Sequence, residues 1–247
     1  MASSARPDST SLVLRHERLI VLAAIGLLVA ASWWFLLTGA GLDHGMDGMV
    51  MAPPPFGALV LMWSLMMVAM MLPSAAPAIL LYARVRAIRG GDADVARSWV
   101  FLAGYLAVWL LFAIVAALAQ SLLAGSSMAL DGEIAPAVLL IAAGLYQLSP
   151  LKSACLQQCR SPAQFISRHW RPGVTGALRL GMLHGAYCVG CCWLLMALLF
   201  VGGVMNFAWI AALTLIIGIE KLVPRGEWLG RAAGVALIGW GIVRLAS

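Results

Sequence analysis

The chain alternates long apolar runs with short segments that hold most of its charged and turn-forming residues. Several runs reach the roughly 20 residues that a helix needs to cross a bilayer. Backbone groups in lipid must be hydrogen-bonded within their own segment, so we expect each run to be an α-helix. The pattern predicts an all-α, polytopic transmembrane helical bundle of about seven spans, near residues 19–38, 57–83, 97–123, 134–151, 178–202, 205–223 and 229–246.

Basic residues alternate between successive loops. They occur in the segments 1–18, 84–97, 152–177 and around 224–228, whereas the segments 39–56, 124–133 and 203–205 contain no Lys or Arg. Short loops rich in Lys and Arg stay on the cytoplasmic side of a membrane. This predicts a cytoplasmic N-terminal tail over residues 1–18, a single transmembrane domain over residues 19–247, and a C-terminus outside.

Composition supports a membrane protein over a soluble one. Hydrophobic residues make up 63% of the 247 and charged residues only 11%, whereas about a quarter of the residues of a soluble domain are charged. The net charge of +6 is scattered over the loops, with no patch that mixes basic and aromatic residues. The expected partner of this charge is the lipid bilayer, and no nucleic-acid partner is expected.

The nine residues from His184 to Cys192 concentrate the reactive side chains. They hold three of the five cysteines and one of the four histidines. At about 100° per residue, Cys188, Cys191 and Cys192 all lie within about 80° of His184 on one side of a helix. Cys188 is about ten residues into its span, hence about 15 Å deep, near the midplane. Free cysteines are often simply buried, but this clustering favours a functional site for metal or redox chemistry.

A group of methionines, which we name the methionine ladder, occupies one half of the second span. Thioethers are soft donors that select Cu(I) over harder divalent cations. A methionine stripe is also a common way to fill gaps in a core, and packing is the alternative. The ladder consists of Met62, Met66, Met67, Met70 and Met71.

A second set of soft donors lies in the segment 39–56, which the predicted topology places outside. The alternative is an interfacial loop whose methionines dip into lipid. The donors of this loop group are His44, Met46, Met49 and Met51, a combination suited to capture of a soft metal.

Two residue pairs are expected at the cytoplasmic side. Cys155 and Cys159 are spaced i, i+4, so on a helical turn their sulfurs would face the same way. Flanking basic residues would favour their thiolates, and two free structural thiols are the alternative. Glu220 and Lys221 end the sixth run. Charges inside a membrane are functional candidates, although snorkelling to the interface explains a terminal pair equally well.

Several blocks resemble one known family. They are the segments 62–74, 146–152, 159–162, 188–193 and 202–206, with Cys155 and the Glu220–Lys221 pair. Together they resemble the bacterial "predicted metal-binding integral membrane protein" family, a domain of unknown function. The resemblance implies metal binding and a multi-pass location in the bacterial inner membrane. It implies no reaction and no particular metal, and the loop group lies outside the matching blocks.

These groups suggest a route for Cu(I) or another soft metal. The loop group would collect the ion outside, and the methionine ladder would pass it inward. The thiols of Cys188, Cys191 and Cys192, with His184, would hold it at mid-membrane. The Cys155–Cys159 pair would receive it in the cytosol. The leading hypothesis is a membrane Cu(I) transport protein that is not an enzyme.

Two alternatives are open. A membrane thiol–disulfide oxidoreductase would use Cys188 with Cys191 and Cys155 with Cys159. Against it, the second pair is predicted in the reducing cytosol, where disulfides do not persist. A copper-delivery or assembly factor would exchange the ion with a copper chaperone or a metalloprotein partner and transport nothing. The sequence does not indicate an oligomeric state.

Overall fold

The structure is a computed structural model that describes residues 9–38, 54–88, 95–123, 130 and 132–246. The described residues form helices and connecting turns, with no strand among them. The all-α prediction is therefore confirmed for this part of the chain. The helices are α1 (Ser9–Leu37), α2 (Phe56–Ile88), α3 (Val95–Leu123), α4 (Ile134–Gln147), α5 (Pro150–Arg160), α6 (Pro162–His169), α7 (Gly173–Ala197), α8 (Leu199–Gly202), α9 (Phe207–Leu222) and α10 (Glu227–Ala246).

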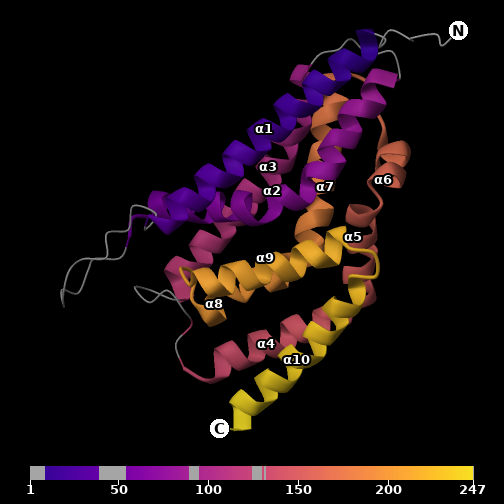
Figure 1. The fold of residues 1–247 in the computed structure, drawn as a ribbon. Coiled ribbons are helices and arrows are strands. Elements are labelled where there is room, and N and C mark those ends of the chain that lie inside the picture. The colour runs from indigo at the N-terminus through magenta and orange to yellow at the C-terminus, as the bar shows by residue number, and fades with distance from the viewer. Residues whose placement is uncertain (1–8, 39–53, 89–94, 124–129, 131, 247) are drawn as a thin grey trace, which may run out of the picture.

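Two groups of helices make up the fold (Figure 1). Helices α1, α2, α3 and α7 run alongside one another, and α4 pairs with α10 at the other end of the molecule, with α9 crossing between them. Glycines allow the closest approaches. A Cβ at Gly181 of α7 would overlap the backbone carbonyl of Phe101 on α3, and one at Gly144 of α4 would overlap the carbonyl of Gly234 on α10. Small residues at such crossings let membrane helices pack by their backbones.

Five helical segments are long and apolar enough to cross a membrane. They are Arg18–Leu37, Phe56–Ile88, Arg97–Leu123, Gly173–Gly202 and Glu227–Ala246. The pair α4 and α5 would make a sixth, but the two helices meet at an angle of 63°. Helix α9 has 16 residues, a length of about 24 Å, which is less than the hydrocarbon thickness of about 30 Å. Among the described residues there are thus five or six candidate spans by length and composition, and the count of seven stays a prediction.

The helices divide two of the predicted segments in ways that run length alone did not indicate. The run 134–151 is broken because Ser149 accepts a hydrogen bond from the backbone N–H of Lys152 and Pro150 is the first residue of α5, a typical helix start. The segment 152–177, expected as a loop between spans, contains most of α5 and all of α6. Helix α1 begins at Ser9, within the predicted tail, and its candidate span begins at Arg18.

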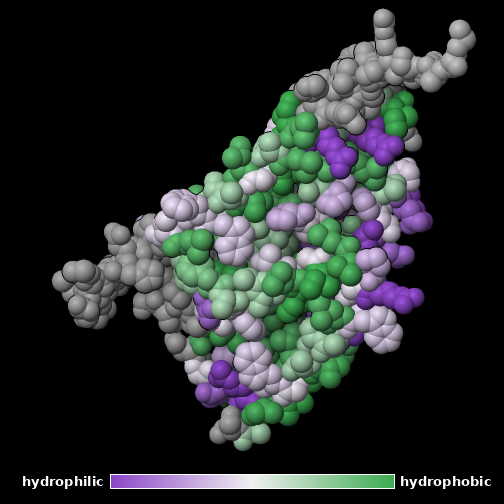
Figure 2. Space-filling view, in the orientation of Figure 1, coloured by the Kyte–Doolittle hydropathy of each residue, from purple (hydrophilic) through white to green (hydrophobic). Residues whose placement is uncertain are grey.

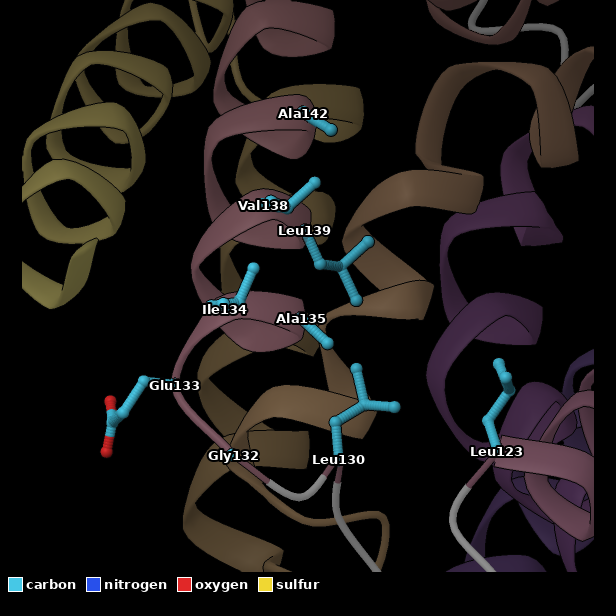
Figure 3. Close-up of a pocket in the computed structure, with 9 residues that line it drawn as sticks. All are labelled: Leu123, Leu130, Gly132, Glu133, Ile134, Ala135, Val138, Leu139 and Ala142. Atoms are coloured by element: carbon cyan, nitrogen blue, oxygen red, sulfur yellow. The ribbon is translucent and has the colours of Figure 1, made fainter.

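The outer surface suits a lipid environment. Large apolar side chains such as Leu27, Trp34 and Leu122 are more than two-thirds exposed, at 71%, 72% and 74%. In Figure 2, hydrophobic residues cover much of the visible face, and hydrophilic ones gather along the right-hand edge and at the lower end. An open apolar pocket of about 690 Å³ lies between α4 and Leu123. Figure 3 shows its lining residues, with the Glu133 carboxylate pointing away from the others.

Candidate metal centre

Four thiols converge at the middle of α7. Cys188, Cys191 and Cys192 are all at most 2% exposed. Cys191 and Cys192 follow Cys188 by three and four residues, so their thiols can both donate to the Cys188 backbone carbonyl, at 3.1 and 2.9 Å. The Cys159 thiol on α5 makes side-chain hydrogen bonds with those of Cys188 and Cys191. Together with Met71 these residues form what we name the sulfur cluster: Met71, Cys159, Cys188, Cys191 and Cys192.

The predicted separation of Cys155 and Cys159 from the mid-membrane thiols is wrong. Helix α5 turns back and packs on α7. A Cβ at Gly190 would lie 3.0 Å from the Cys155 sulfur, which places this thiol against the same stretch of α7. The hydroxyl of Tyr146 donates to the Gly190 carbonyl and holds the end of α4 there as well. The break at Ser149 and Pro150 is the physical reason, because it redirects the chain toward α7 instead of away from it.

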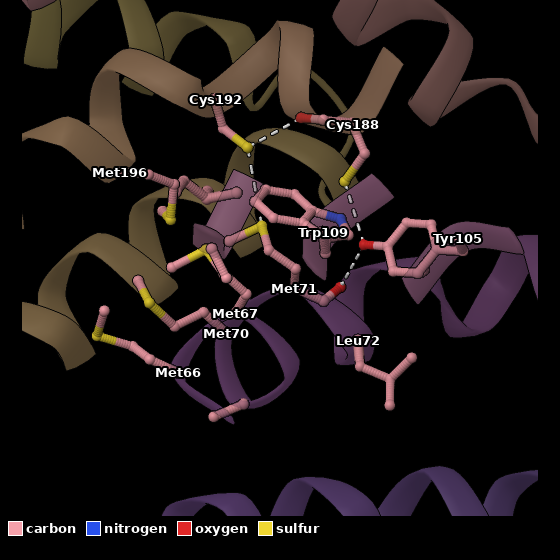
Figure 4. Packing of buried hydrophobic residues seen from close by; sticks show 14 of the residues in the cluster. Met66, Met67, Met70, Met71, Leu72, Tyr105, Trp109, Cys188, Cys192 and Met196 are labelled. Carbon is pink, nitrogen blue, oxygen red and sulfur yellow. Dashed lines mark hydrogen bonds between the residues drawn. The ribbon is translucent and has the colours of Figure 1, made fainter. Parts of the chain in front are cut away.

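Met71 joins the methionine ladder to the thiols. Its sulfur lies 3.8 Å from the Cys192 sulfur. All five ladder methionines are at most 2% exposed, and Figure 4 shows the sulfurs of Met66, Met67 and Met70 gathered on the side of Met71 that faces away from Cys188. Met196 of α7 lies among them. Sequence reasoning missed Met196, although its position four residues after Cys192 on the same helix face would have revealed it.

A buried ammonium group contacts the cluster. Lys221 Nζ lies 3.0 Å from Cys188 Sγ, 3.7 Å from Met71 Sδ and 3.5 Å from Ser74 Oγ. Lys221 is 6% exposed, so its head lies inside the protein and the snorkelling interpretation fails. The Tyr105 hydroxyl lies 3.2 Å from the same Cys188 sulfur and 3.3 Å from the Met71 carbonyl, and its single hydrogen can be donated to one of the two. Cys188 thus has a cation beside its sulfur, which stabilises a thiolate, and a hydroxyl that can donate to that thiolate.

Glu220 faces away from the cluster and anchors α9. Its carboxylate accepts from Lys152 Nζ at 2.6 Å and from Gln147 Nε2 at 2.9 Å. The Lys152 and Glu220 side chains are 3% and 2% exposed. The ammonium of Lys152 also donates to the side-chain oxygen of Gln147. This network joins α4, α5 and α9 beside α7.

His184 lies one turn before Cys188 but among aromatic rings. Its ring is 5.3 Å from that of Phe165, 5.8 Å from that of Tyr105 and 6.1 Å from that of Phe101, measured between centroids. The residue is 3% exposed, and within the described chain its Nδ1 has no hydrogen-bond partner. The predicted ligand role of His184 stays a prediction. The loop group of His44, Met46, Met49 and Met51 lies outside the described residues.

The donors suit a soft ion better than a hard one. No three His, Cys, Asp or Glu side chains of the described residues stand in coordinating geometry. Thiolates and thioethers select Cu(I), and a pair of soft donors in line is sufficient for that ion. The three thiols of α7 are buried, that of Cys159 is partly exposed, and all four are free of disulfides. The large apolar cavity is lined by the first turns of α4, at the end of that helix away from the cluster.

Comparison with known proteins identifies a copper family. A family model described as PpoB2, copper chaperone, matches residues 60–244. The match includes the methionine ladder, α5, α7 and α9, and it begins after the loop group. It agrees with the resemblance in being metal-related, although the family is a different one from that named on the sequence blocks. No curated protein and no solved structure matches the chain.

Proposed function

The chain belongs to the PpoB2 copper chaperone family, and we propose that it binds Cu(I) at the sulfur cluster inside the membrane and passes it along the methionine ladder to a metalloprotein partner. Copper is the cargo, and the chain has no catalytic role in this proposal. Two thiolates, one of them Cys188, hold the ion, and Met71 is the first thioether on the way out. The proposal rests chiefly on the 3.8 Å contact between the Met71 and Cys192 sulfurs.

The ladder gives the ion a graded path. Thioethers bind Cu(I) as neutral donors, whereas thiolates add charge attraction, so affinity rises from the ladder to the cluster. Outward delivery against this gradient therefore requires a partner that binds Cu(I) more tightly than the cluster does. From Met62 to Met71 the path is about 14 Å long. That length is about half the hydrocarbon thickness. The sulfur donors therefore lead from the midplane to one membrane face, the face where α2 begins and to which the predicted topology assigns the loop group.

The one-sided path favours delivery over transport. On the other side of the cluster, the first turns of α7 offer one sulfur within the described residues, that of Met182, which is 46% exposed and outside the buried core. Cys159 belongs to the cluster and Cys155 lies beside it, so neither thiol extends the path beyond it. A route through the whole membrane would need donors on both sides. We therefore place transport second, supported by the ladder alone.

The test is copper binding by the full chain purified without oxygen in lipid nanodiscs. The native chain should hold Cu(I) against a chromophoric chelator. Joint replacement of Cys188, Cys191 and Cys192 by Ser should abolish this binding. Met71→Leu should leave the amount of bound copper unchanged and slow its transfer to the chelator. Met182→Leu is the matched control, because this methionine lies outside the ladder, and it should change neither quantity.

Two results would refute the proposal. Equal copper retention by the native chain and the triple Ser variant would remove the cluster as the site. Copper uptake into sealed vesicles that contain only this chain would favour transport over delivery.

A further inference from the structure

The two buried lysines near the centre differ in how their charges are balanced. Lys152 is paired with the carboxylate of Glu220 at 2.6 Å. Lys221 makes no ion pair with a carboxylate among the residues that the structure describes, and its nearest polar partner is the Cys188 sulfur at 3.0 Å. A buried ammonium without a compensating anion is strongly unfavourable. Among the described residues the group in contact that can supply a compensating charge is the Cys188 thiol, as a thiolate.

The position of Lys221 is fixed by its surroundings. The side chain leaves the last turn of α9, whose end is held by the Glu220 network. Its ammonium lies between Cys188, Met71 and Ser74. Two of these three are sulfur donors of the proposed site. The ammonium therefore lies close to any ion that these two sulfurs bind.

We propose that Lys221 is the specificity-determining residue that makes the sulfur cluster select a monovalent metal ion. Its fixed positive charge offsets one of the two negative charges of a thiolate pair, so one further positive charge makes the site neutral. This deepens the proposed function and rests on it. Two thiolates and Lys221 together carry one net negative charge. Cu(I) brings the buried site to neutrality, whereas a divalent ion such as Zn(II) leaves it positive. An uncompensated charge is costly at the centre of a membrane.

The inference makes a prediction of opposite sign for two metals. In Lys221→Met the two thiolates carry two uncompensated negative charges, so Zn(II) restores neutrality and Cu(I) does not. The ratio of retained Zn(II) to retained Cu(I) should rise about 10⁴-fold, because the roughly hundredfold cost of one uncompensated buried charge is removed from Zn(II) and imposed on Cu(I). Lys221→Arg keeps the charge and should keep the native preference.

The experiment loads the purified full chain with equal Cu(I) and Zn(II) without oxygen and measures both metals after gel filtration. Lys221→Gln is a second uncharged variant and carries the test if Lys221→Met does not fold. The matched control is the double variant Lys152→Met with Glu220→Gln. It removes a balanced buried pair without changing the net charge near the cluster, so its metal ratio should equal that of the native chain.

The outcomes separate the two proposals. An uncharged Lys221 variant that folds and keeps the native metal ratio would overturn the role of Lys221 while leaving copper binding intact. A native chain that retains Zn(II) as well as Cu(I) would do the same. A native chain that retains no Cu(I) would remove both proposals. A rise in the ratio that is confined to the uncharged variants would establish the charge as its cause.

Discussion

The ion pair between Lys152 and Glu220 allows a quantitative prediction. Both side chains are nearly inaccessible, at 3% and 2%, and their charged atoms lie 2.6 Å apart. Removing one partner of a buried pair leaves the other charge without compensation, at a cost of about 3–5 kcal/mol. Replacing both partners together is often close to neutral. We therefore expect Glu220→Gln to lower the free energy of unfolding by about 3–5 kcal/mol. The double variant that adds Lys152→Met should recover most of that loss.

The assay is unfolding of the detergent-solubilised chain by increasing SDS, followed by circular dichroism. The difference in unfolding free energy between the single and the double variant measures the cost of the uncompensated Lys152 charge, separately from the cost of the lost hydrogen bond to Gln147. Because Glu220 faces away from the sulfurs, copper bound per folded molecule should be the same in all three proteins. Equal destabilisation of the single and double variants would show that the pair acts through packing and that the charge argument is wrong.

Three further predictions concern packing and the state of the thiols. Gly181→Ala should lower the free energy of unfolding by about 1–3 kcal/mol, because its Cβ would overlap the Phe101 carbonyl. Gly57→Ala is the control, since its Cβ would lie in open space. It should cause no measurable change in the same SDS titration. Tyr105→Phe should cost about 1 kcal/mol through the hydrogen bonds lost around Cys188 and should still permit copper loading; an unchanged unfolding curve would contradict this. Acid quenching of cells, followed by alkylation of the denatured protein, should find all five cysteines reduced, and a disulfide between any two would favour the oxidoreductase alternative.

Apolar periodicity was sufficient to predict the fold class and the five candidate spans. The break between α4 and α5 was also readable, since Ser149 followed by Pro150 is a helix start in the middle of an apolar run. The length of the apolar run 134–151 instead favours one unbroken span, which is the prediction made above. The error displaced Cys155 and Cys159 from the centre of the site to a loop. An unbroken span gives the predicted path that crosses the membrane, whereas the broken helix supports the proposed path, which ends at the cluster.

The position of Lys221 could not be derived in the same way. Helical periodicity places residues on faces of their own helix, but it does not say which neighbour that face meets or at what depth. A full span over residues 205–223 places Lys221 at a membrane interface, which is why the sequence predicts it there. In the structure the C-terminal end of α9 reaches the middle of α7, beside Cys188. Only the packing of α9 against α2 and α7 gives this depth.

The adjacency of Glu220 and Lys221 explains how one helix end serves both structure and site. Neighbouring residues on a helix point about 100° apart, so the carboxylate can meet Lys152 while the ammonium meets Cys188. The carboxylate thus ties α9 to α4 and α5, and in the proposal above the ammonium sets the charge that Cys188 presents to an ion.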